Sequence, residues 1–119
     1  MSAYTFNQPV PQINVEAFAA HRADVQQPLQ LIDVREPEEL AIAQLEGFVN
    51  LPLSQFSDWS GQINTILDPT VETIVMCHHG MRSAQMCQWL INQGFTTVKN
   101  LVGGIDAYAD RVDSGVPRY

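Results

Sequence analysis

Two residues capable of joint chemistry, Cys77 and Arg82, lie close together at a change in the sequence pattern. An apolar run ends at the cysteine, and a helical pattern begins after the arginine. We therefore expect Cys77 at the carboxyl end of a strand and Arg82 at the mouth of a helix. A thiolate is the nucleophilic form of cysteine, and a guanidinium binds anions through a planar fork of N–H groups. The pair predicts a nucleophile that acts on an anionic substrate.

The loop between these two residues favours the thiolate. Successive backbone N–H groups in such a loop turn toward its centre and form an anion-binding nest, to which the positive end of the helix dipole adds. Gly80 gives the loop a residue that adopts positive φ or lies close to another backbone segment. We predict that Cys77 and Arg82 are catalytic. The remaining loop residues are predicted to bind substrate: His78, His79, Gly80, Met81 and Ser83.

The alternative for Cys77 is a structural role, since free cysteine is among the most buried residue types. It would then end a strand as a small apolar residue, and Arg82 would be an ordinary surface cation. The presence of both with Gly80 and Ser83 in one strand–loop–helix unit favours the catalytic interpretation. For Cys87 we predict the structural role, because it lies on the inward stripe of the following helix with Ala84, Leu90 and Ile91.

The adjacent histidines raise the question of a metal site that includes Cys77. Adjacent residues in a tight loop rarely converge on one ion, and no carboxylate or second thiol stands nearby at ligand spacing. We therefore expect no metal, and we place His78 and His79 at the rim of the site, where they face the substrate or the next acceptor. His21, in an earlier helical pattern, is expected to be a surface residue.

Strand and helix patterns alternate along the chain. This alternation predicts an α/β fold with a mostly parallel central sheet and helices on both faces. Ligands of such folds bind beyond the carboxyl ends of the strands, where Cys77 stands. The expected strands are residues 29–34, 48–51, 73–76 and 96–101. The expected helices are residues 15–21, one that begins at Pro37, 54–67 with Ser54 as N-cap, 83–93 and 105–112.

Composition limits the classes of partner. The 119 residues predict one domain, residues 1–119, and a net charge of −7 disfavours nucleic acid and anionic membranes. The two cysteines form no disulfide framework. Residues 1–9 lack the basic and apolar regions of a signal peptide, and no apolar run approaches the roughly 20 residues of a membrane span. We expect a cytoplasmic protein, in which thiols stay reduced.

The sequence resembles the single-domain rhodaneses, which are sulfurtransferases of the rhodanese homology superfamily. Residues 77–83 match the active-site loop of that family, with Cys77 in the place of the sulfur-carrying cysteine. Residues 31–39, 50–54 and 100–105 resemble the early strand motif, the exit of the second strand, and the last strand and turn, in the family's order. Two places depart from the pattern. Residues 43–45 read Ala-Gln-Leu where Gly-His-Ile is frequent, and Tyr108 stands where tryptophan is usual.

The resemblance implies a mechanism without a cofactor. The Cys77 thiolate takes the outer sulfur of a small anionic donor such as thiosulfate, and the resulting persulfide passes it to cyanide or to a thiol of a small molecule or protein. Arg82 would bind the donor and steady the loop. Asp33 and Arg35 would lie near the site, where we expect Arg35 to pair with a glutamate and hold the next helix.

Other interpretations of the loop are a cysteine phosphatase or an arsenate reductase, which also combine a thiolate, loop amides and an arginine. Four residues separate Cys77 from Arg82, whereas tyrosine phosphatases place five there, so the shorter loop favours sulfur over phosphate. A docking or regulatory module with this fold is a second alternative, which the retention of Cys77, Gly80 and Arg82 disfavours. A protein sulfur carrier that serves one specific partner stays open.

Overall fold

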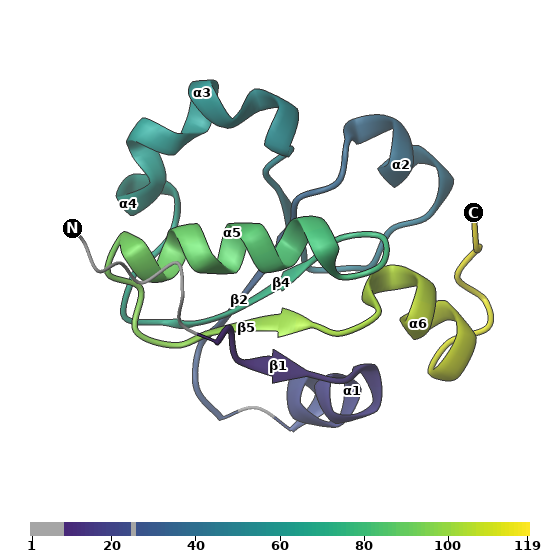
Figure 1. Ribbon diagram of the computed structural model, residues 1–119. Helices are drawn as coiled ribbons and strands as arrows, with labels where there is room; N and C mark the ends of the chain where they lie inside the picture. Colours follow the sequence, from purple (N-terminus) through teal and green to yellow (C-terminus); the bar gives the residue numbers. More distant parts are fainter. Residues whose placement is uncertain (1–8, 25) are drawn as a thin grey trace.

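Five parallel strands form one sheet in the order β1-β5-β4-β2-β3 (Figure 1). The computed structural model describes residues 9–24 and 26–119, so the absence of a signal peptide in the first residues is a prediction about a segment outside the described residues. The parallel sheet that the alternating pattern predicts is confirmed. The strands are β1 (Gln12–Ile13), β2 (Leu29–Asp33), β3 (Val49–Asn50), β4 (Glu72–Met76) and β5 (Val98–Leu101).

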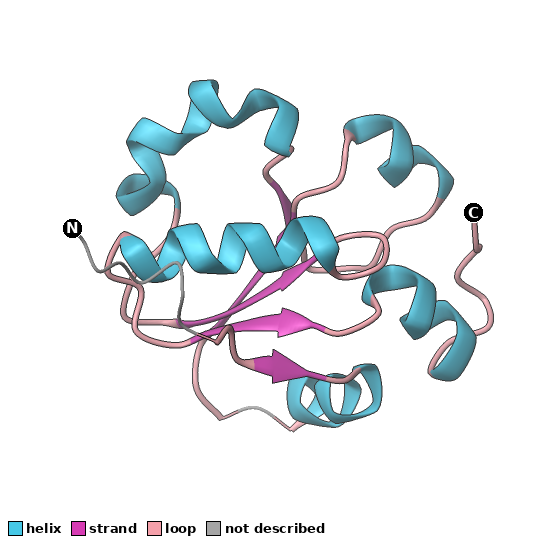
Figure 2. Ribbon diagram, in the orientation of Figure 1, coloured by secondary structure: helices cyan, strands magenta, loops and turns pink. Residues whose placement is uncertain are grey.

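The central strand β4 is buried on both faces, as its apolar sequence predicts. Side chains of a strand alternate between the faces of the sheet. Ile74 and Met76 belong to the core that also contains residues of α1 and α6, whereas Val75 and Cys77 belong to the core built with α5. Helices therefore cover both faces of the sheet, as expected (Figure 2). Cys77 faces the α5 side.

The helices are α1 (Val15–Ala23), α2 (Pro37–Ile42), α3 (Phe56–Trp59), α4 (Ile63–Ile66), α5 (Met81–Asn92) and α6 (Gly104–Arg111). Pro37 occupies the first turn of α2, where its missing N–H leaves no helical bond unmade, and Glu36 and Glu39 form a capping box there. Among the described residues, no helix combines the length and the apolar character needed to cross a membrane.

The single helix predicted for residues 54–67 is wrong. The segment divides into 3₁₀ turns at Leu53–Gln55 and Ser60–Gln62, each followed by one of the short helices α3 and α4. Gly61 sits in the second 3₁₀ turn, and a glycine in a helix interior costs about 1 kcal/mol relative to alanine. Ser54 does not cap a helix, because its hydroxyl donates to the Glu36 carboxylate.

Helix α5 begins at Met81, two residues before the predicted start at Ser83. Gly80 precedes it with φ 103°, a left-handed conformation that favours glycine. A side chain at this position would also meet neighbouring backbone, since an added Cβ would lie 3.2 Å from the Gly103 nitrogen. The glycine thus lets the chain turn from β4 into α5 in very few residues and places Arg82 inside the first helical turn.

Candidate active site

The sulfur atom of Cys77 lies at the centre of the loop that joins β4 to α5. The residue is 1% exposed, and its Sγ accepts a hydrogen bond of 3.0 Å from the Gly80 N–H. The Ser83 hydroxyl lies 3.3 Å from the same sulfur. The structure therefore brings together three of the predicted site residues, and the N–H group of Gly80 stabilises negative charge on the sulfur.

Helix α6 holds the opposite side of this loop. The carbonyl oxygens of Cys77 and His78 accept hydrogen bonds from the N–H groups of Ile105 (3.0 Å) and Asp106 (3.1 Å). These carbonyls consequently point toward α6. Gly104 permits the approach, since an added Cβ would stand 2.3 Å from the Cys77 carbonyl oxygen. Sequence reasoning placed this glycine only within a family motif and did not identify its contact with the loop.

Asn100, at the end of β5, is a buried positioning residue that sequence reasoning did not single out. Its Nδ2 donates to the Gly80 carbonyl (3.1 Å) and to Gln12 Oε1 (3.0 Å). These two bonds leave Oδ1 to accept from the Ser83 hydroxyl at 2.5 Å. One amide group therefore fixes both the peptide of Gly80 and the orientation of Ser83, the two groups that contact the sulfur.

Arg82 forms a bidentate ion pair with Glu39 of α2. Its Nη1 and Nη2 donate to the two carboxylate oxygens at 2.7 and 3.0 Å. The Arg82 hydrogen bonds lower the pKa of the Glu39 carboxyl to about 2, against a smaller opposing effect of burial. The same bonds raise the pKa of Arg82. Cys77 makes a smaller electrostatic contribution to that rise.

The expectation that Arg35 pairs with a glutamate is wrong. Arg35 is completely buried and pairs with Asp33 at the end of β2, through Nη2–Oδ2 at 2.7 Å and Nε–Oδ1 at 3.0 Å. Glu39 offers it only its backbone carbonyl, because the carboxylate is engaged by Arg82. Burial alone would lower the pKa of Arg35, but the hydrogen bonds to Asp33 and Tyr119 raise it. Arg35 is thus a structural cation.

The rim of the site is aromatic. The rings of His78 and His79 stack with centroids 3.9 Å apart, and Tyr119 lies on His78 at 3.8 Å and an interplanar angle of 4°. The predicted outward position holds for His79, and Met81 on the same loop is 77% exposed. His78 is half-buried, and among the described residues its Nε2 has no hydrogen-bond partner. Burial, followed by the neighbouring His79, lowers the pKa of His78.

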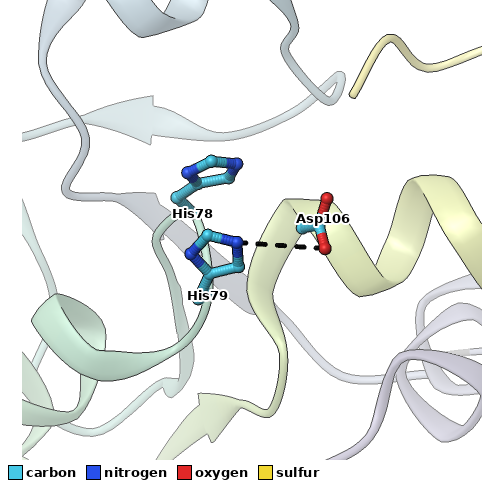
Figure 3. Close-up of side chains that lie close together, drawn as sticks. All are labelled: His78, His79 and Asp106. Atoms are coloured by element: carbon cyan, nitrogen blue, oxygen red, sulfur yellow. Dashed lines mark ion pairs between the residues drawn. The ribbon is translucent and has the colours of Figure 1, made fainter. Parts of the chain in front are cut away.

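His78 and His79 point toward Asp106 of α6 (Figure 3). One ligand-type atom from each residue falls within 4.8 Å of the others, and His79 Nε2 lies 3.9 Å from Asp106 Oδ2. The two rings are stacked at an interplanar angle of 29°. Arg118 also binds both oxygens of Asp106, at 3.0 and 3.1 Å. This arrangement fits an ion-pair cluster better than a preformed metal site.

Cys87 faces the core from α5, as predicted, and is fully buried. Desolvation, and next to it the negative charge of Cys77, raises the pKa of its thiol to about 12. A thiol with this pKa stays protonated near neutral pH and is a poor nucleophile. The structure therefore separates the two cysteines by environment.

The chain is similar to known proteins over most of its length. It is 45% identical over 114 residues to "Rhodanese-like/PpiC domain-containing protein 12, chloroplastic" of Arabidopsis thaliana, which covers 94% of this chain and 38% of that protein. It is 33% identical over 100 residues to the "Sulfurtransferase" of Allochromatium vinosum, which covers 84% of this chain and 89% of that protein. The crystal structure of a rhodanese-like domain protein from Staphylococcus aureus matches with a TM-score of 0.74 and 23% identity, over 92% of this chain and 99% of that one, and shows the fold alone.

The family model of the rhodanese-like domain matches residues 15–111. This range contains the sheet from β2 to β5, the Cys77 loop, and the helix α6 that holds the loop carbonyls. With the parallel sheet and the position of Cys77 at the end of its central strand, the match confirms the resemblance seen in the sequence. The chain belongs to the rhodanese-like domain family.

Proposed function

We propose that this protein is a sulfurtransferase that carries a sulfane sulfur as a persulfide on Cys77. The observation that carries the proposal is the surroundings of the sulfur: Sγ lies in a short loop, accepts the Gly80 N–H at 3.0 Å, and stands beside the Ser83 hydroxyl. The amides of Met81, Arg82 and Ser83 add donors, because the first N–H groups of a helix have no intrahelical acceptor. A second sulfur on Cys77 would extend toward these groups.

The reaction divides into two half-reactions. In the first, the Cys77 thiolate attacks the outer sulfur of a donor such as thiosulfate. A new S–S bond forms on Cys77 while the S–S bond of the donor breaks, and sulfite leaves with the bonding electron pair. In the second, cyanide or a cellular thiolate attacks the outer sulfur of the persulfide, and Cys77 leaves as a thiolate. No step requires a cofactor or a metal.

The spacing of the loop supports sulfur as the transferred group. Four residues separate Cys77 from Arg82, one fewer than in tyrosine phosphatases, so the ring of amides is smaller. A narrower ring suits a single sulfur atom, whereas a tetrahedral phosphate needs a wider one. Hydrolysis of aryl phosphates is therefore expected to be slower than sulfur transfer.

A protein sulfur carrier is the second candidate function. It uses the same persulfide but hands the sulfur to one partner protein. The exposed side chains of His79 and Met81 at the rim favour such a contact, since they lie on the loop that holds the sulfur. The two functions differ in the acceptor. An enzyme transfers sulfur repeatedly to small thiols or cyanide, whereas a dedicated carrier takes up one sulfur atom and transfers it only to its partner protein.

The proposal extends to the organisation and surroundings of the chain. Residues 1–119 would act as a single rhodanese-like domain in the cytoplasm, where thiols are kept reduced and Cys77 stays available. The net charge of −7 is consistent with a partner that is a small molecule or a protein. It disfavours nucleic acid and anionic membranes as partners.

Mass spectrometry of the intact protein tests the proposal. After incubation with a sulfur donor, the protein is expected to gain the mass of one sulfur atom, and peptide mapping should locate it on Cys77. Cys77→Ser should gain nothing, whereas Cys87→Ser should still load. Sulfur on Cys87, or loading that survives in Cys77→Ser, would refute the proposed site. Turnover with cyanide then distinguishes the enzyme from a carrier.

A further inference from the structure

The segment that follows α6 returns to the site, although it lies beyond residues 15–111 of the family match. Val116 is buried in the core that contains residues of α1 and α6. Arg118 then binds both carboxylate oxygens of Asp106, in the first turn of α6. These contacts lead the chain to Tyr119, and the yellow end of the ribbon lies between α6 and α2 (Figure 1). The segment thus spans from α6, which holds the loop carbonyls, to α2.

The Tyr119 hydroxyl connects the two ion pairs of the site. It accepts a hydrogen bond from Arg35 Nη1 (2.9 Å) and donates one to Glu39 Oε1 (2.7 Å). These directions are fixed, because a guanidinium only donates and a carboxylate only accepts. Burial raises the pKa of Tyr119, against the effect of the hydrogen bond from Arg35, so the hydroxyl keeps its proton near neutral pH. Arg35 is completely buried and bound to Asp33, which gives this chain of hydrogen bonds a fixed end.

Each oxygen of the Glu39 carboxylate accepts one hydrogen bond from Arg82 and one from another group. Oε2 also accepts from the Glu36 N–H at 3.0 Å, within the capping box of α2. Oε1 also accepts from the Tyr119 hydroxyl. In a bidentate pair, the carboxylate determines the orientation of the guanidinium fork. Because the capping box engages only Oε2, the orientation of Arg82 depends on Tyr119 as well.

The ring of Tyr119 holds the hydroxyl in this place. It stacks on His78, the residue after Cys77, with centroids 3.8 Å apart and an interplanar angle of 4°. His78 also stacks on His79, at 3.9 Å. Tyr119→Phe keeps the ring contact and removes only the two hydrogen bonds of the hydroxyl. Since Tyr119 is 37% exposed, this substitution is expected to leave the fold intact.

We propose that Tyr119 is a positioning residue for the loading of sulfur on Cys77. Its hydroxyl acts through Glu39 and fixes the Arg82 guanidinium at the mouth of the loop. The inference rests on the proposed function and on the predicted role of Arg82 in binding the donor. The N–H groups of Arg82 that Glu39 does not engage are the ones left for a donor, and their direction follows from that of the ion pair.

The first test compares the parent, Tyr119→Phe and Tyr108→Phe in the loading of Cys77 from thiosulfate, followed by intact mass. Tyr119→Phe is expected to raise the half-saturating thiosulfate concentration and to lower the second-order rate constant of loading roughly 3- to 10-fold, part of the effect of one charge-assisted hydrogen bond. Tyr108→Phe removes the hydroxyl of a tyrosine that packs on Phe18 of α1, and it should load like the parent. Thermal unfolding checks that each variant is folded. Unchanged loading by Tyr119→Phe would overturn the inference.

The Arg82→Ala background separates a positioning role from a general loss of stability. If the hydroxyl acts through Arg82, the double variant Tyr119→Phe/Arg82→Ala loads at the same rate as Arg82→Ala alone. A purely structural role of Tyr119 would instead lower the rate by the same factor in both backgrounds. That result would overturn the inference.

Chemical modification gives a second readout that does not depend on sulfur transfer. Phenylglyoxal modifies guanidinium groups, and peptide mapping gives the labelling rate of Arg82, whose side chain is 37% exposed. Tyr119→Phe is expected to raise this rate relative to that of Arg111, an internal reference whose side chain is 62% exposed. An unchanged labelling rate of Arg82 would overturn the inference, even if loading falls. Failure of the parent to gain sulfur would refute the proposed function, while the labelling rates would still decide whether Tyr119 fixes Arg82.

Discussion

The α-carbon of Gly104 lies so close to the carbonyl oxygen of Cys77 that a Cβ on it would stand 2.3 Å away. The same Cβ would lie 2.5 Å from the His78 carbonyl oxygen. Both neighbours are backbone atoms of the Cys77 loop, and backbone cannot move aside as the end of a flexible side chain can. The first turn of α6 and the Cys77 loop therefore hold each other in place.

Gly104→Ala is expected to lower both stability and sulfur transfer. The left-handed φ of 60° alone costs a non-glycine residue about 1–2 kcal/mol, and the clash adds displacement of the loop carbonyls. Thermal unfolding and the loading rate of Cys77 measure the two effects. Gly94→Ala is the matched control, because its φ of 95° is also left-handed but nothing lies within 4 Å of the added Cβ. It should lose stability and keep its loading rate. Equal loading by the two variants would contradict the role of Gly104.

Asn100→Asp is expected to slow sulfur transfer roughly 10-fold or more, because a carboxylate accepts from Ser83 but cannot donate to the Gly80 carbonyl. The added negative charge also disfavours the thiolate, so the pH at which Cys77 alkylation reaches half its maximal rate should rise. That pH profile distinguishes a positioning role from a general loss of stability. Asn92→Asp, at the exposed end of α5, introduces the same charge away from the loop and should leave the profile unchanged.

Alkylation at mildly acidic pH should label Cys77 and leave Cys87 unmodified. The pKa of about 12 keeps the Cys87 thiol protonated, whereas the Sγ of Cys77 accepts the Gly80 N–H, which favours a thiolate. Cys87→Ser should keep its transfer activity and lose roughly 1–3 kcal/mol of stability, since a buried hydroxyl has no partner there. Faster labelling of Cys87 in the folded protein, or activity lost in Cys87→Ser with the fold intact, would reverse the assignment.

Arg82→Ala should reduce kcat/KM for thiosulfate roughly 10- to 150-fold, the range that corresponds to one charge-assisted hydrogen bond. The variant also leaves the Glu39 carboxylate without its partner beside the loop. Arg82→Lys keeps the charge but not the bidentate fork, and should recover only part of the loss. The double variant Arg82→Ala/Glu39→Gln should transfer sulfur faster than Arg82→Ala alone. Unchanged turnover by Arg82→Ala would show that the arginine is purely structural.

The Glu39–Arg82 pair should make the domain sensitive to acid. The folded pKa of Glu39 is about 2, below its ordinary 4.5, so its contribution to stability is complete above about pH 4.5 and disappears as the pH falls toward 2. Chemical unfolding at several pH values should show this loss in the parent and a smaller one in Glu39→Gln. Parallel curves for the two proteins would indicate that the pair contributes no pH-dependent stability.

Structural features formed by residues close to one another in the sequence could be predicted best. The β4 strand, the loop and α5 form one continuous segment, so apolar runs and a glycine were enough to place Cys77 at the end of a strand. The parallel sheet followed from the same alternation. The strand β1 was missed because two residues are too few to show a pattern.

Contacts between distant segments were not predictable in the same way. Arg82 and Glu39 are separated by 43 positions, and either could have paired with other charges. The sequence suggested a glutamate for Arg35, but the carboxylate of Asp33, two residues away and buried with it, takes that place. Asn100 resembled an ordinary strand residue, since its role depends on Gly80 and Ser83 arriving from another element.

The binding of the loop carbonyls by α6 also sets an order of assembly. A ribosome makes Cys77, Gly80 and Arg82 well before it makes Ile105 and Asp106, whose amides hold those carbonyls. A nascent chain that ends after α5 therefore contains the cysteine without the two hydrogen bonds that hold its loop. Closing these contacts carries the entropic cost of a long-range loop, so the Cys77 loop reaches its folded geometry only when the last helix docks.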